Sequence, residues 1–163
     1  MKLAWLQDLN PFGAPTGAES TDRAHIIHGI RAGHDIEVIL PAPSFDVSWA
    51  DLVVISNATG FPVDTLKSID RPYIVFLHDY AFLCRWRLFY PMLEKCRDCY
   101  LKPRFLPLLL GSNLIIWLSP LHRDSWLFTY PEIAHHPHAL VPSAIDVDQF
   151  FDLHLERRGV IAG

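Results

Sequence analysis

The sequence predicts an α/β domain built on a doubly wound parallel sheet with helices on both faces. Apolar runs rich in β-branched and aromatic residues recur along the chain, and helix-length segments separate them. Several of these runs are nearly all apolar instead of alternating, which is typical of strands buried on both sides. Repeated strand–helix units joined by right-handed crossovers give a Rossmann-like arrangement.

Six strands are expected from these runs. They cover residues 3–6, 36–40, 52–56, 73–77, 114–118 and 139–141.

The first helix has the clearest boundaries. Thr16 is followed three residues later by Glu19, the spacing of a capping box. Ala24, Ile27 and Ile30 predict the inward stripe, and Gly33 fits the left-handed cap at the end of the helix. The long connection 8–15 before this helix follows the carboxyl end of a strand, where this architecture binds ligands.

Residues 105–121 contain no charged side chain, so a membrane span has to be considered. Pro107, Gly111 and Pro120 divide the stretch. We therefore expect a short helix that ends at Gly111, a turn and a strand.

Composition limits the function classes. With 163 residues, half of them apolar and a fifth charged, one globular domain is the default. The net charge of -4 argues against general nucleic-acid binding. Three cysteines form no disulfide framework, and the short apolar N-terminus is followed at once by Asp8, so we expect a cytoplasmic protein without a signal peptide.

The start of the first helix is a candidate anion site. Backbone amides at Thr16, Gly17 and Ala18 are placed to meet a phosphate, and the helix dipole favours negative charge there. An ordinary capped helix start is the alternative. The dinucleotide motif G-x-G-x-x-G is absent, so bound NAD is disfavoured and no cofactor is expected.

His78 follows the strand at 73–77 directly, and Asp79 and Tyr80 come next. A histidine at a strand end can donate to a sugar hydroxyl or to a developing charge, and it titrates near neutrality. The alternative is a histidine that is hydrogen-bonded to a neighbouring loop.

Two groups of residues suggest metal binding only weakly. Cys84, Cys96 and Cys99 include a single C-x-x-C pair, whereas zinc sites prefer four ligands. The segment 135–138 carries three histidines before a strand, which is more often a solvated loop. We assign no metal site.

Residues 85–104 carry six cations against two acids, with aromatic side chains among them. Arg85 and Arg87 open this region. Cations with aromatics suit a phosphate-bearing acceptor or an anionic membrane surface. The alternative is a solvated helix pair whose aromatic side chains pack on the sheet.

Four segments resemble the N-terminal domain of retaining nucleotide-sugar glycosyltransferases of the two-domain GT-B fold, family-four group. Residues 16–19 resemble the Gly-Gly-x-Glu loop that opens the first helix. Residues 78–80, with Cys84 after them, resemble the His-Asp-Tyr segment. Residues 119–122 match a strand end and helix start that often begins with Ser. Residues 141–146 resemble the Val-Pro-Asn-Gly-Ile-Asp stretch before the interdomain crossover.

The resemblance implies one half of a GT-B fold: residues 1–150 as the acceptor-side domain, and 151–163 as the crossover and the start of a C-terminal donor-binding domain. It implies transfer of a sugar from a nucleotide-sugar donor to a sugar or lipid-linked acceptor with retention of configuration, by a full-length enzyme of which this part alone is inactive. Peripheral membrane contact is compatible with it.

By position in the family, His78 would contact the transferred sugar and Thr16, Gly17 and Ala18 the donor diphosphate. Asp79, Tyr80, Arg85 and Arg87 become candidates for the acceptor wall. Thr16 stands where the family has glycine, and Ser143 and Ala144 stand for Asn-Gly.

Two other functions stay open. One is a non-catalytic module that binds a saccharide or an anion. The other is a nucleotide-sugar epimerase of GT-B architecture, which would turn over without a separate acceptor.

Overall fold

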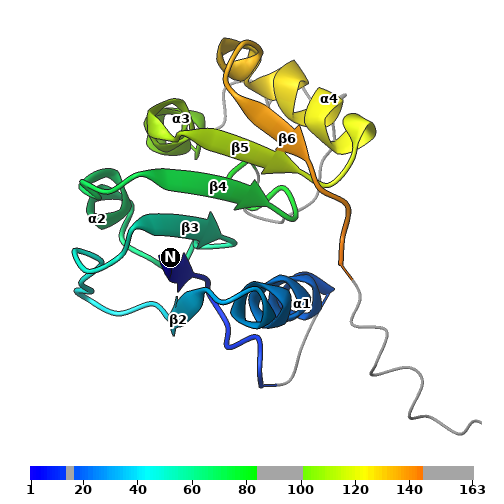
Figure 1. Ribbon diagram of the computed structural model, residues 1–163. Coiled ribbons are helices and arrows are strands. Elements are labelled where there is room, and N and C mark those ends of the chain that lie inside the picture. The colour runs from blue at the N-terminus through cyan, green and yellow to red at the C-terminus, as the bar shows by residue number, and fades with distance from the viewer. Residues whose placement is uncertain (14–16, 84–100, 145–163) are drawn as a thin grey trace, which may run out of the picture.

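The computed structural model describes residues 1–13, 17–83 and 101–144. This part of the chain forms one all-parallel sheet of six strands in the order β2-β1-β3-β4-β5-β6 (Figure 1). The strands are β1 (Lys2–Leu6), β2 (Asp35–Ile39), β3 (Leu52–Ser56), β4 (Tyr73–Leu77), β5 (Leu114–Trp117) and β6 (His138–Leu140). The helices are α1 (Gly17–Arg31), α2 (Val63–Lys67), α3 (Leu101–Gly111) and α4 (Pro120–Thr129), followed by the 3-10 turn η2 (Pro131–Ile133).

The predicted fold class is confirmed. β3 and β4 have the expected bounds, β1 and β5 differ from expectation by one residue at one end, and β2 and β6 are each shifted by one residue. The order reverses between β1 and β3, because β2 lies outside β1 while the later strands are added on the other side. Ligands of doubly wound sheets bind outside the carboxyl ends of the strands at such a point.

Helices cover both faces of the sheet. On one face the larger core joins Leu66 of α2, Leu108 of α3 and Trp126 of α4 to Val53 and Val75 of the central strands. On the other face Ile26 of α1 packs with Trp5, Val54 and Phe76. In Figure 1, α1 lies near β1 and β2, whereas α4 lies at the opposite edge beside β5 and β6.

The inward stripe predicted for α1 is partly wrong. Ala24 is buried, but Ile30 is 51% exposed. The buried side of the helix instead carries Glu19, Asp22 and Ile26. A hydrophobic pattern misses this orientation because carboxylates normally face water and are buried only where partners satisfy them.

Helices α1 and α3 both end where the sequence predicts. Gly33 has φ +86°, so it forms the left-handed cap after α1. α3 ends at Gly111 as expected, where an added Cβ would lie 2.4 Å from the buried hydroxyl of Tyr73. That hydroxyl donates to the Leu108 carbonyl at 2.8 Å. In the described ranges, no helix has both the length and the apolar character needed to cross a membrane.

Candidate functional site

Polar residues follow the strands at the edge of the sheet where β1, β3 and β4 end. Asp8 lies just beyond β1, Asn57 directly after β3, and His78 directly after β4. The amide of Asp8 donates to the Asn57 carbonyl at 3.1 Å, and its carboxylate accepts from Thr59 at 2.7 Å. The loop after β3 is therefore tied to the segment that follows β1, at the point where the strand order reverses.

A buried hydrogen-bond network joins α1 to this edge. His78 Nε2 lies 2.8 Å from Asp22 Oδ1, and the Ser56 hydroxyl donates to Asp22 Oδ2 at 2.7 Å. The His78 and Asp22 side chains are 3% and 2% exposed, and Ser56 is fully buried. Three segments distant in sequence thus meet at one carboxylate.

The network determines which ring nitrogen of His78 carries a proton. An ionised carboxylate only accepts hydrogen bonds, so Nε2 must donate to Asp22. In the neutral ring Nδ1 then has a free lone pair and is an acceptor. A carboxylate that orients a histidine in this way is a frequent feature of functional sites, although buried ion pairs also occur in purely structural networks.

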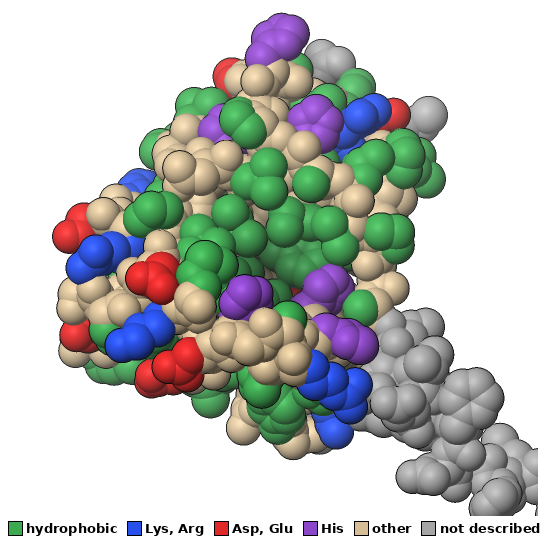
Figure 2. Space-filling model, in the orientation of Figure 1, with side chains coloured by type: hydrophobic (Ala, Val, Ile, Leu, Met, Phe, Trp, Pro, Cys, Tyr) green, Lys and Arg blue, Asp and Glu red, His purple; other side chains and the backbone are tan. Residues whose placement is uncertain are grey.

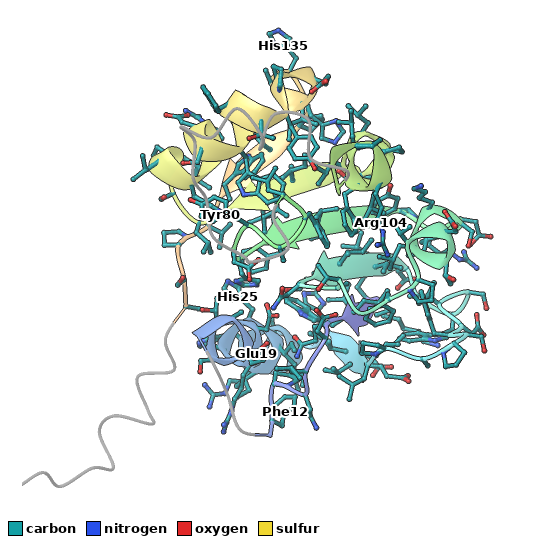
Figure 3. All side chains as sticks on the ribbon, turned by 180° about the vertical axis from the view of Figure 1, so that it is seen from behind. Phe12, Glu19, His25, Tyr80, Arg104 and His135 are labelled. Carbon is teal, nitrogen blue, oxygen red and sulfur yellow. The ribbon has the colours of Figure 1, made fainter. Side chains whose placement is uncertain are left out.

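The imidazole of His78 lies against Phe76, with ring centroids 4.1 Å apart. His25 of α1 contacts the same phenyl ring edge-on at 5.2 Å. Figure 3 shows His25 directed from α1 toward the end of β4. On the face shown in Figure 2, histidine side chains border a hollow lined by apolar ones. His78 is therefore packed between α1 and the sheet, and only 3% of its side chain is exposed.

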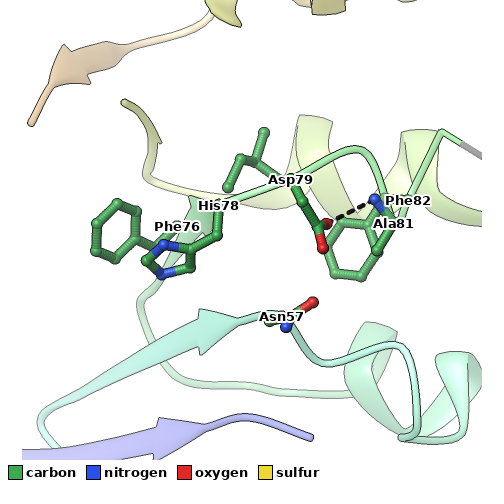
Figure 4. A pocket seen from close by; sticks show the side chains of 7 residues that line it. Asn57, Phe76, His78, Asp79, Ala81 and Phe82 are labelled. Carbon is green, nitrogen blue, oxygen red and sulfur yellow. Dashed lines mark hydrogen bonds between the residues drawn. The ribbon is translucent and has the colours of Figure 1, made fainter. Parts of the chain in front are cut away.

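A small cavity of about 10 Å³ lies at the ends of β3 and β4, with room for about one water molecule. Its walls are formed by Asn57, Phe76, Leu77, His78, Asp79, Ala81 and Phe82. Asp79 Oδ1 accepts the amide of Ala81 at 2.7 Å, which fixes the turn after β4 (Figure 4). Asn57 Oδ1 is buried and has no hydrogen-bond partner.

The start of α1 is open. Gly17 is exposed, and an added Cβ there would meet nothing within 4 Å. Ala18 is half-buried and Glu19 is buried. Thr16, and with it the capping box, lies outside the described residues. The open approach at Gly17 is compatible with an anion site and equally with a capped helix start.

The predicted acceptor residues separate into two groups. Asp79 lines the pocket, whereas the ring of Tyr80 packs edge-on against His122 at 5.2 Å and stacks on Trp126 at 6.4 Å. Arg85 and Arg87 lie outside the described residues. Of the six cations in the basic region, Arg104 alone has a described side chain, and its guanidinium lies 5.3 Å from the Phe105 ring.

His122 is a second buried histidine near the site. The indole N–H of Trp126 donates to its Nε2 at 3.0 Å, so that nitrogen is unprotonated. Burial lowers the pKa of His122 below its usual 6.5, and nearby His78 acts in the same direction, whereas the main chain and carboxylate of Asp79 oppose the shift. His122 is therefore neutral at neutral pH, and its amide caps α4 by donating to Ser119 Oγ at 3.1 Å.

No group of three or more His, Cys, Asp or Glu side chains in the described ranges is arranged to hold a metal ion. In the histidine cluster at 135–138, His136 contacts the Ser112 hydroxyl at 3.0 Å, and His138, the first residue of β6, contacts the His136 carbonyl at 3.2 Å. Cys84, Cys96 and Cys99 lie outside the described residues.

Comparison with known protein families gives no matching family model, and comparison with curated proteins gives no match.

The sequence singled out His78 as a candidate, but not Asp22 and Ser56, which the structure joins to it, nor Asn57, which lies beside it. Asp22 lies three residues after Glu19, so the two carboxylates share one side of α1, and this spacing was the available signal. Ser56 is the one hydroxyl in an otherwise apolar strand. Nothing in the local sequence indicates that these two side chains meet His78.

Proposed function

We propose that this chain is the acceptor-side domain of a retaining glycosyltransferase of GT-B type, and that His78 contacts the sugar being transferred. The supporting observation is the His78–Asp22 pair at the carboxyl end of β4, 2.8 Å between Nε2 and Oδ1 and almost fully buried. A buried pair of polar side chains contributes less to stability than apolar packing of the same volume, so a ligand role would account for its presence.

The roles follow from the hydrogen-bonding groups. Asp22 and Ser56 hold His78 so that Nδ1 accepts a hydrogen bond from a sugar hydroxyl, or donates one when the ring is protonated. The exposed start of α1 at Gly17 approaches the donor diphosphate through backbone amides. In the proposed enzyme, the residues that bind the diphosphate of the donor belong to a second domain. We therefore expect residues 1–163 alone to bind nucleotide sugars weakly and not to turn them over.

The test is sugar transfer by the full-length protein with a panel of nucleotide sugars and candidate acceptors. We expect His78→Ala to lower turnover by orders of magnitude. His78→Gln is the sharper variant, because its amide still donates to Asp22 while the ring acceptor is lost.

The proposal is supported if the wild type transfers sugar and His78→Gln loses this activity while keeping its fold. Equal kinetics in both variants and the wild type would remove His78 from the site. Absence of transfer with every donor, together with saccharide binding, would favour a binding module. Turnover without an acceptor would favour an epimerase.

A further inference from the structure

One half of the sheet is poorly covered on the face that carries α1. Of the four described helices, α2, α3 and α4 all contribute to the core on the opposite face, whereas α1 alone contributes to the core on this one, through Ile26. Strands of an all-parallel sheet are normally covered on both faces. The part of this face that lies beyond α1 is therefore expected to have a partner.

The poorly covered part runs along β4 and β5. Ile74, Ile116 and Leu118 lie on this face and are only partly buried, although β4 and β5 are interior strands of the sheet. On the same face, Val54 and Phe76 are 3% and 2% exposed. Figure 2, in the orientation of Figure 1, shows an apolar hollow between α1 and α4. We call Ile74, Ile116 and Leu118 the open strip.

The sequence that follows β6 has the pattern of a helix suited to this strip. Residues 145–163 lie outside the described residues, so this pattern is taken from the sequence alone. Apolar side chains recur there at the spacing of one helix side, with His154 among them: Val147, Phe150, Phe151 and Leu155. The other sides of such a helix carry the acids: Asp146, Asp148, Asp152 and Glu156. Such a pattern predicts an amphipathic helix that buries one side.

The connection is long enough to bring this helix to the open strip. β6 ends at Leu140, and in Figure 1 residues 141–144 continue from it in the direction of α1. The six residues 141–146 can span about 20 Å when extended, whereas neighbouring strands lie about 4.8 Å apart. A helix over residues 147–156 is about 15 Å long, close to the length of a five-residue strand.

We propose that residues 147–155 form a helix that packs its apolar side on the open strip, next to α1. The rings of Phe150 and Phe151 lie over Ile74, Ile116 and Leu118. This packing removes apolar surface of both partners from water, which is the force that favours it. The inference does not depend on the proposed function, because it concerns how the domain is covered and not what it binds.

The test is a nuclear Overhauser spectrum of residues 1–163 with labelled isoleucine and leucine methyl groups. We expect cross-peaks from the ring protons of Phe150 and Phe151 to the methyl groups of the open strip. Ile30 is the control, because it is 51% exposed and lies on α1, so its methyl groups should show no such cross-peak.

A double-mutant cycle in urea unfolding gives a second readout. Phe150→Ala and Ile116→Ala should be coupled by about twofold or more in the unfolding constant, because residues in contact are not additive. Leu153→Ala is the matched control: Leu153 belongs to the same segment but lies off its apolar side, so its effect should add to that of Ile116→Ala.

Three outcomes contradict the inference. Cross-peaks from the open strip to another part of the chain would assign the strip to that part. Cross-peaks found between differently labelled copies would show that a second copy covers the strip. The absence of cross-peaks from Phe150 and Phe151, together with additive effects of Phe150→Ala and Ile116→Ala, would show that the helix does not pack there.

Discussion

Replacing Asp22 with alanine should lower the free energy of unfolding more than the same replacement of a surface carboxylate. Asp22 accepts from the Ser56 hydroxyl at 2.7 Å and from His78 Nε2 at 2.8 Å, and all three side chains are buried. Alanine leaves two buried donors without partners, at about 1–3 kcal/mol each. Because the carboxylate itself no longer has to be desolvated, we expect a net loss of about 2–4 kcal/mol.

Conservative changes should cost less. In Asp22→Asn, the amide oxygen can still accept from His78, and the amide nitrogen can donate to the Ser56 oxygen after its hydroxyl rotates. We expect a loss of about 1 kcal/mol, the difference between a charge-assisted and a neutral network. Ser56→Ala removes one donor to a charged acceptor and should cost about 1.5–3 kcal/mol.

The measurement is the free energy of unfolding in urea, followed by far-ultraviolet circular dichroism, with the slope m checked for constancy. Asp124→Ala is the control, because Asp124 is 61% exposed and its contact is a surface ion pair with Arg123. If Asp22→Ala unfolds at the same urea concentration as Asp124→Ala, the network does not hold α1 on the sheet. A loss of about 2–4 kcal/mol would leave a domain of ordinary stability, 5–15 kcal/mol, folded but weakened.

Three further predictions follow from the same contacts. Gly111→Ala should lower the free energy of unfolding by about 1–3 kcal/mol, because the new methyl lies 2.4 Å from the Tyr73 hydroxyl and breaks its bond to Leu108; wild-type stability would show that the ring shifts freely. Stability should fall as the pH drops below about 6.5, because the lowered pKa of His122 makes the unfolded chain bind this proton at a higher pH than the folded form does; urea unfolding of wild type and His122→Asn at about pH 7.5 and about pH 5.5 tests this, and an equal pH effect in both excludes His122. Gly17→Val should leave the described fold intact, since nothing lies within 4 Å of the new Cβ, but should weaken nucleotide-sugar binding by the full-length protein; equal affinity would mean that residues 16–18 only start a helix.

The sequence was a good guide where local pattern determines structure. The strands at Leu52–Ser56 and Tyr73–Leu77 are short apolar runs between turn residues, and burial on both faces of a parallel sheet requires that composition. Gly33 takes the left-handed conformation that caps a helix, and α3 ends at Gly111 as expected, although this glycine has no positive φ.

The site could be predicted only in part, because it depends on contacts between distant residues. His78 was found from its place after a strand, but its partner Asp22 is 56 residues away and Ser56 is 34 residues from Asp22. Hydrophobic periodicity placed Ala24 correctly on the inner side of α1 but put Ile30 there in place of Glu19 and Asp22, since it treats every carboxylate as facing solvent. The orphan oxygen of Asn57 is visible only when its surroundings are known.

The most direct test of a ligand role for the buried histidine is the ¹⁵N spectrum of the His78 ring in the full-length protein, recorded with and without saturating nucleotide sugar. Nε2 should be protonated in both states because Asp22 holds it at 2.8 Å. Addition of the sugar nucleotide should shift the Nδ1 resonance, as expected for a new hydrogen bond from a sugar hydroxyl. Nδ1 and Nε2 resonances that stay in place at saturation would contradict contact between His78 and the transferred sugar.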